Sequence, residues 1–351
     1  MTTRSLFITS ILILSTLSKS SPELPAPDSN LENDPLLNTT HLLNNQGVRN
    51  HLKTYYNAQS FTCTTADNIM IDGIYVPRNN ATHTTIAAAG FYPGNQEGMA
   101  SLVKLLPEDS NILFFDARGH GKSTGWLFPN LPYYGMHEYK DIIAVMDMAK
   151  SFDNKPLIML GICAGGFNTL RALVELKKQE KLEQYDVRCV ILDSLFTSGT
   201  HVLHAGHYHF GQKVIPQMLR STLYPNDTSA TVKDRLLYKL LWNFLGYPLV
   251  SLLKWTVQDS IKQHDPITCA DDKIHFLKNI PILYIHANND GYAPIEHVKT
   301  LKEKHANDQD QMLIFDKSKH AFNLLIHKHE YRKNICNFVA KIIATMQAPT
   351  M

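Results

Sequence analysis

The chain has 351 residues, of which 44% are hydrophobic, and 34 basic against 32 acidic side chains give a formal net charge of +2 at pH 7. This composition is ordinary for a globular protein with a substantial core, and one enzyme-sized domain accounts for the length. The charged residues form no basic block, which argues against nucleic acid as a partner.

The first 50 residues predict a leader and a linker. Arg4 precedes an apolar stretch that ends in small residues near Ser20, which is the layout of a secretory signal peptide over residues 1–20. Residues 21–50 begin with several prolines and show no periodicity, so we predict a linker. We therefore expect a secreted or periplasmic protein. The alternative is an ordinary buried or interfacial helix in a cytoplasmic or membrane-associated protein.

Residues 51–348 are predicted to form one α/β domain. Residues 59–77 alternate apolar and polar side chains around Asp67 and Asn68, which predicts an antiparallel hairpin. Short apolar runs then alternate with helical spacing at residues 139–152 and 167–185, which predicts a mostly parallel sheet covered by helices on both faces. The apolar runs lie at residues 85–89, 111–115, 157–161, 187–192, 281–285 and 311–315.

Residues 196–274 interrupt this alternation, because they carry no strand signal. An insertion of this length predicts a helical lid near the carboxyl ends of the strands, where ligands bind in open α/β sheets. We expect the lid to shape the substrate pocket and to contact a lipid-like acyl chain. Its histidines lack the carboxylate or thiol that metal sites usually add, so we predict no metal and no cofactor. These histidines are His201, His204, His207 and His209.

The most informative segment runs from Gly161 to Gly165, with Cys163 in its centre at the end of an apolar run. Glycines two positions on either side allow a sharp strand-to-helix turn that presents one side chain. A helix that begins after the cysteine lowers the pKa of a thiol at its N-terminus, so Cys163 is a candidate nucleophile. Cys189 lies in an apolar run and is predicted to be a buried thiol; the pairing of the other cysteines stays open.

Five motifs, taken together, resemble the α/β-hydrolase superfamily. The nucleophile elbow, two turns after strands, a helix start and a final histidine segment occur in the order that this fold uses. The resemblance covers roughly residues 55 to 345 and implies an α/β-hydrolase fold. The motifs lie at residues 115–123, 134–141, 161–165, 288–294 and 317–322.

The resemblance and the chemistry together assign three catalytic roles. A thiol nucleophile needs a base, for which His320 after the last strand is the candidate. That imidazole needs a carboxylate on its other nitrogen, for which Asp290 is the candidate. Asp193 ends an earlier strand, at a position that some members of the superfamily use instead, and it is the alternative acid.

By resemblance, the backbone N–H groups of Phe91 and Ala164 form the oxyanion hole. Ala89 stands where the family commonly has a histidine, and a backbone donor survives that change. Residues 118–123 resemble a structural turn, and neither His120 nor Ser123 is predicted to be catalytic.

Cysteine replaces the serine that this superfamily usually carries at the elbow; dienelactone hydrolases and acyl-CoA amino acid acyltransferases are similar in having cysteine there. Because an alkoxide is a poorer leaving group than a thiolate, the cysteine favours thioesters, lactones or activated esters. We expect a hydrolase or acyltransferase that acts on a small acyl substrate. The alternatives are a catalytically inactive binding protein on a hydrolase scaffold and a surface regulated by oxidation of Cys163. The sequence leaves the oligomeric state open.

Overall fold

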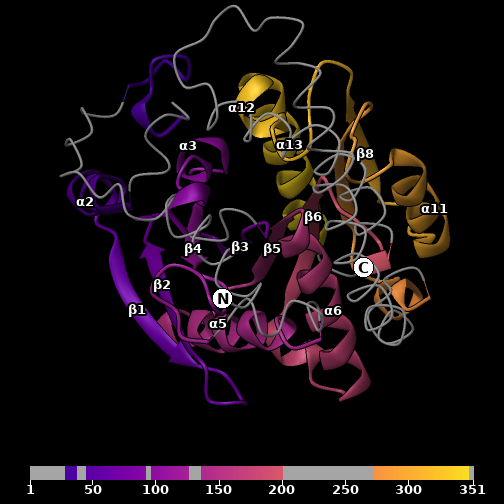
Figure 1. Ribbon diagram of the computed structural model, residues 1–351, viewed down its shortest axis with the longest axis horizontal. Helices are drawn as coiled ribbons and strands as arrows, with labels where there is room; N and C mark the ends of the chain where they lie inside the picture. Colours follow the sequence, from indigo (N-terminus) through magenta and orange to yellow (C-terminus); the bar gives the residue numbers. More distant parts are fainter. Residues whose placement is uncertain (1–27, 38–44, 92–95, 126–135, 201–271, 348–351) are drawn as a thin grey trace, which may run out of the picture.

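In the computed structural model of the protein, residues 28–37, 45–91, 96–125, 136–200 and 272–347 are described. They build one eight-stranded sheet with the strand order β1-β2-β4-β3-β5-β6-β7-β8 (Figure 1). The pairs from β4 through β8 are parallel, whereas β1 pairs with β2 and β2 with β4 in antiparallel fashion. The predicted α/β-hydrolase fold is confirmed.

The strands fall close to the apolar runs that predicted them. The hairpin strands are β1 (Gln59–Thr64) and β2 (Met70–Val76), and Asn68 between them adopts a left-handed φ of 62°, which asparagine tolerates. The parallel strands are β3 (His83–Ala88), β4 (Ser110–Phe115), β5 (Leu157–Ile162), β6 (Val187–Asp193), β7 (Ile282–Ala287) and β8 (Gln311–Phe315).

Helices cover both faces of the sheet (Figure 1). Alternate residues of β4 point to opposite faces: Leu113 and Phe115 join one buried cluster, and Ile112 and Phe114 join the other. The first cluster lies under α5 (Tyr139–Phe152), α6 (Ala164–Lys178) and α11 (Ile295–His305), with the short helices η4 (Leu182–Tyr185) and η7 (Ile274–Leu277). The second lies under η1 (Pro35–Leu37), α2 (Asn45–Tyr56), α3 (Leu102–Leu105), α12 (Asn323–Ile326) and α13 (Lys328–Gln347).

Part of the segment predicted as a linker over residues 21–50 packs against the domain. Leu36 and Leu37 are buried, and Val48 on the first turn of α2 is completely buried in the same cluster. Burying each such side chain is worth about 1.5–3 kcal/mol, which holds this segment against the domain. The few apolar residues are too widely spaced to form a periodic pattern, so the proline-rich composition concealed them.

Two other predicted segments lie outside the described residues. The leader over residues 1–20 is one, and residues 201–271 of the predicted lid are the other. Within the described part of the chain, no helix is long and apolar enough to cross a membrane.

Candidate active site

Cys163 occupies the sharp turn between β5 and α6. Its φ of 53° and ψ of −116° lie outside the ordinary regions for a residue with a side chain, a conformation that costs about 1–3 kcal/mol. Two glycines make the turn possible. A Cβ at Gly161 would lie 2.4 Å from Gly166 Cα, and a Cβ at Gly165 would lie 2.1 Å from the Ala88 carbonyl oxygen.

Three side chains from the ends of three strands meet at this turn. His320 Nε2 lies 3.0 Å from Cys163 Sγ, and His320 Nδ1 lies 2.8 Å from Asp290 Oδ2. Cys163 follows β5, Asp290 follows β7 and His320 follows β8. Because these strands are parallel, their carboxyl ends lie along one edge of the sheet. The structure thus brings together the residues predicted to be nucleophile, acid and base.

The carboxylate of Asp290 is fully buried and held in one orientation. Its Oδ1 accepts the backbone N–H groups of Tyr292 and Ala293, both at 2.9 Å, which leaves Oδ2 facing His320. Burial raises the pKa of Asp290, but the hydrogen bond from His320 and the two backbone donors outweigh burial, so the net shift is downward. Asp290 is therefore ionised at neutral pH.

His320 is held between a carboxylate and a sulfur. Burial lowers the pKa of His320, while the hydrogen bonds to Asp290 and Cys163 raise it, and the balance brings the pKa to about 10. The raised pKa favours the form of the ring that carries a proton on both nitrogens. Its Nδ1–H donates to Asp290, and its Nε2–H points to the Cys163 sulfur.

The alternative acid, Asp193, contacts other partners. It is completely buried, and its Oδ1 accepts hydrogen bonds from Ser194 Oγ at 2.9 Å and Asn323 Nδ2 at 2.6 Å. Ser194 Oγ in turn accepts the backbone N–H of Ala321, next to His320, at 2.9 Å. Burial raises the pKa of Asp193 above its ordinary value. This network holds the loop that carries the histidine, while Asp290 makes the hydrogen bond to the ring.

The predicted oxyanion donors lie beside the nucleophile. Ala164 is the first residue of α6 and directly follows Cys163. Phe91 follows Gly90, where a Cβ would lie only 3.3 Å from Cys163 Cβ and 3.9 Å from its sulfur. Glycine at this position therefore lets the loop before Phe91 approach the nucleophile closely.

The turn after β4 is held by a hydrogen bond within it and by contacts to neighbouring segments. Ser123 Oγ donates to the Asp116 carbonyl oxygen at 2.6 Å and accepts the Asp72 N–H at 2.9 Å. Arg118 forms ion pairs with Asp67 at 2.9 Å and Asp141 at 2.7 Å. Ser123 therefore has a structural role. His120 contacts the carbonyl oxygen of Phe91, and the motif alone did not reveal this contact.

Within the described residues, no group of three or more His, Cys, Asp and Glu side chains could hold a metal ion. The predicted lid histidines belong to residues 201–271, outside that part of the chain. Cys63, Cys163 and Cys336 are partly buried free thiols, and Cys189 is a buried free thiol in the core, as its apolar run predicted.

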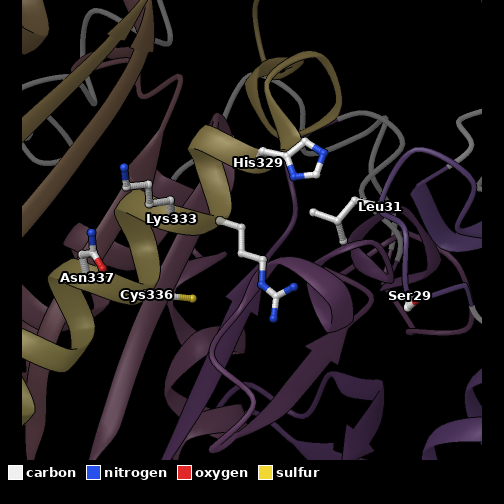
Figure 2. A pocket seen from close by; sticks show the side chains of 7 residues that line it. Ser29, Leu31, His329, Lys333, Cys336 and Asn337 are labelled. Atoms are coloured by element: carbon white, nitrogen blue, oxygen red, sulfur yellow. The ribbon is translucent and has the colours of Figure 1, made fainter.

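Two open clefts lie elsewhere on the described surface. Figure 2 shows the first, where Leu31 of the N-terminal segment lies across from His329 and Cys336 of α13. Its volume is about 500 Å³. The second, of about 620 Å³, lies between the same segment and α12, where it is lined by Phe322. Neither lining includes a residue of the Cys163 site, so neither cleft is the candidate active site.

Comparison with known sequences gives a consistent result. A family profile described as alpha/beta hydrolase fold matches residues 92–325. The uncharacterized protein YfhR of Escherichia coli is 30% identical over 149 residues, which are 41% of this chain and 49% of YfhR. The chain therefore spans about half the length of this relative. The uncharacterized protein YqkD of Bacillus subtilis is 21% identical over 286 residues, 80% of this chain and 78% of YqkD.

Solved structures show the same fold. The esterase Pf2001 of Pyrococcus furiosus matches with a TM-score of 0.57 at 17% identity, covering 92% of this chain and 98% of the esterase. The alpha/beta hydrolase GrgF of Penicillium sp. sh18 matches with a TM-score of 0.56 at 16% identity, covering 82% of this chain and 99% of GrgF. At these identities the likeness concerns the fold.

Proposed function

The chain belongs to the α/β-hydrolase family, and from that premise we propose that it cleaves thioesters, lactones or activated esters through an acyl-cysteine intermediate. The observation that carries the proposal is the pair of contacts at His320, 3.0 Å to Cys163 Sγ and 2.8 Å to Asp290 Oδ2. A nucleophile, a base and an orienting carboxylate within hydrogen-bond distance are what covalent catalysis requires.

In the proposed acylation step, the Cys163 thiolate attacks the carbonyl carbon of the substrate. A carbon–sulfur bond forms, and the carbonyl π electrons move to the oxygen. When this tetrahedral intermediate collapses, the bond to the leaving group breaks and His320 gives its Nε2 proton to that group. The negative charge of Asp290 stabilises the imidazolium before the transfer and keeps the ring in place throughout.

In the proposed deacylation step, the neutral His320 accepts a proton from water as the water oxygen attacks the thioester carbon. The carbon–sulfur bond then breaks, the acid product leaves, and the thiolate and imidazolium are restored. Transfer to an amine or alcohol follows the same steps with a different acceptor, so both acceptors belong in the test.

We assign the oxyanion of both tetrahedral intermediates to the backbone N–H groups of Phe91 and Ala164. The close approach of Gly90 to Cys163 supports the first donor. The position of Ala164 at the start of α6 supports the second, because the positive end of the helix dipole favours negative charge there.

The thiol limits the substrate class. When the two possible leaving groups of the tetrahedral intermediate are the Cys163 thiolate and an alkoxide, the thiolate leaves more readily. Its departure returns the substrate. A thiolate, enolate or nitrophenolate is a better leaving group than an alkoxide, so it competes more effectively with the Cys163 thiolate. The proposed substrates are therefore small acyl compounds with a good leaving group, and the predicted lid is proposed to contact their acyl chain.

The test compares leaving groups at a constant acyl group, using a thioester, a p-nitrophenyl ester and an ethyl ester, with water and then a primary amine as acceptor. The wild type is expected to turn over the first two, Cys163→Ala none, and Cys163→Ser to gain on the ethyl ester relative to the thioester. Cys63→Ala, at another partly buried thiol, is the matched control and should behave as wild type. If Cys163→Ala retained all of these activities, the proposal would be overturned. Absence of turnover in the wild type would favour a binding protein.

A further inference from the structure

We propose that His120 is a positioning residue for the oxyanion hole, because it holds the peptide group of Phe91 in place. The inference rests on the proposed function, since the oxyanion exists only during acyl transfer. The motif around residues 118–123 predicts a structural turn, and the structure adds a contact from that turn to the site.

The contact is a hydrogen bond to the backbone of the oxyanion loop. His120 Nε2 lies 3.0 Å from the Phe91 carbonyl oxygen, and Nδ1 lies 3.1 Å from the Arg118 carbonyl oxygen. A carbonyl oxygen only accepts, so the bond to Phe91 requires the tautomer that carries its proton on Nε2, and the proposal assigns that tautomer to His120. The two rings also meet edge to face, with centroids 6.0 Å apart and an interplanar angle of 84°. His120 thus contacts both the backbone and the side chain of Phe91.

This contact bears on the donor because of the covalent geometry at Phe91. The N–H and the C=O of Phe91 belong to two peptide planes that share its Cα. The plane before Phe91 is confined by Gly90, which lies against Cys163. The plane after it is confined by His120. With both planes held, the N–H keeps one direction, which is the preorganisation that oxyanion stabilisation requires.

The turn that carries His120 also holds the loop at a second place. Asp116 Oδ1 accepts the Gln96 backbone N–H at 2.8 Å, and Asp116 Oδ2 accepts Gln96 Nε2 at 3.1 Å. Both residues are completely buried. The segment from Asp116 to His120 therefore holds the chain at Phe91 and again at Gln96, and the Ser123 and Lys122 bonds to Asp116 keep that segment rigid.

Two substitutions separate the hydrogen bond to Phe91 from the rest of the histidine. In His120→Gln, the side-chain NH₂ falls near the position of Nε2 and keeps a donor toward Phe91. In His120→Asn, the shorter side chain places its NH₂ near the position of Nδ1, on the side of Arg118. Complete loss of an oxyanion donor costs about 10²- to 10³-fold in rate, so loosening one is expected to cost about 10- to 100-fold.

The readout is the ratio of two reactions of the same sulfur. In acylation by p-nitrophenyl acetate, the carbon–sulfur bond forms through an oxyanion, and p-nitrophenolate leaves with the bonding electrons. In alkylation by iodoacetamide, the sulfur displaces iodide at a saturated carbon and no oxyanion forms. Both reactions need the Cys163 thiolate, and both are followed by intact mass.

In His120→Asn, the acylation rate is expected to be about 10- to 100-fold lower than in the wild type, while the alkylation rate stays within about twofold of the wild type. In His120→Gln, the acylation rate is expected to stay within about threefold of the wild type. Equal acylation of His120→Asn and wild type would overturn the inference. An equal fall of both rates would also overturn it, because it would indicate a general structural role. If wild-type Cys163 is alkylated but never acylated, the proposed function itself fails, and this inference falls with it.

Discussion

Replacement of Asp290 by Asn tests the assignment of the acid most severely. Two backbone N–H groups, from Tyr292 and Ala293, donate to Oδ1 at 2.9 Å each, so the amide oxygen of the variant has to occupy this position. The amide NH₂ then faces His320 Nδ1 across the 2.8 Å contact and donates to it. The neutral ring is forced to carry its proton on Nε2, so it can no longer accept a proton from water during deacylation. The fold keeps its hydrogen bonds, while the catalytic tautomer is lost.

The expected loss in kcat/KM is about 10²- to 10⁴-fold, which is roughly 2.7–5.4 kcal/mol of transition-state stabilisation. The assay is steady-state hydrolysis of the p-nitrophenyl ester, with thermal unfolding as a check of the fold. Asp193→Asn is the matched comparison, because its side-chain oxygen still accepts from Ser194 and Asn323, and it should lose less than about tenfold. A smaller loss in Asp290→Asn than in Asp193→Asn would refute the assignment and move the acid to Asp193.

Three further predictions concern stability, pH and processing. Gly165→Ala should lower the free energy of unfolding, measured in urea, by about 1–3 kcal/mol, because the added Cβ would lie 2.1 Å from a carbonyl oxygen. Gly166→Ala should lower the free energy of unfolding by less, because its added Cβ would lie 3.2 Å from the nearest atom. The folded pKa of His320, about 10, exceeds its ordinary value of about 6.5, so its contribution to stability is complete below pH ~6.5 and is lost as the pH rises through about 10. Between pH 7 and 10, the free energy of unfolding of Asp290→Asn is expected to fall less than that of the wild type. Equal falls would contradict the raised pKa of His320. Expression in a secreting host should release a chain that begins at Ser21, and retention of the leader on secreted protein would disprove the predicted cleavage.

Local patterns in the sequence predicted the sheet, and the resemblance to the α/β-hydrolase motifs predicted the three residues that meet at His320. The helix expected over residues 139–152 coincides with α5, and the run at residues 157–161 falls within β5. Parallel strands place their carboxyl ends along one edge, so motifs that follow β5, β7 and β8 come together without any knowledge of side-chain packing. This explains why motif order was enough to assemble Cys163, Asp290 and His320.

The supporting contacts were not predictable in this way. The hydrogen bond from His120 to Phe91 joins residues 29 positions apart, and that from Asn323 to Asp193 joins residues 130 positions apart. Such contacts depend on how side chains pack and produce no periodic pattern in the sequence. The N-terminal segment escaped prediction for a related reason, because Leu36 and Leu37 lie in η1, a helix of three residues that is too short to show an apolar period, and tertiary contacts bury them.

In the proposed mechanism, Cys163 carries the acyl group during turnover. Rapid quenching in acid of the full chain with a thioester substrate, followed by peptide mass analysis, measures this directly. We expect a transient acyl adduct on the peptide that contains Cys163, and it should form faster than product is released. His320→Ala should slow this reaction. Full turnover with no adduct on Cys163 at any time, or an adduct on Cys63 or Cys336 that accounts for all the product, would contradict this mechanism.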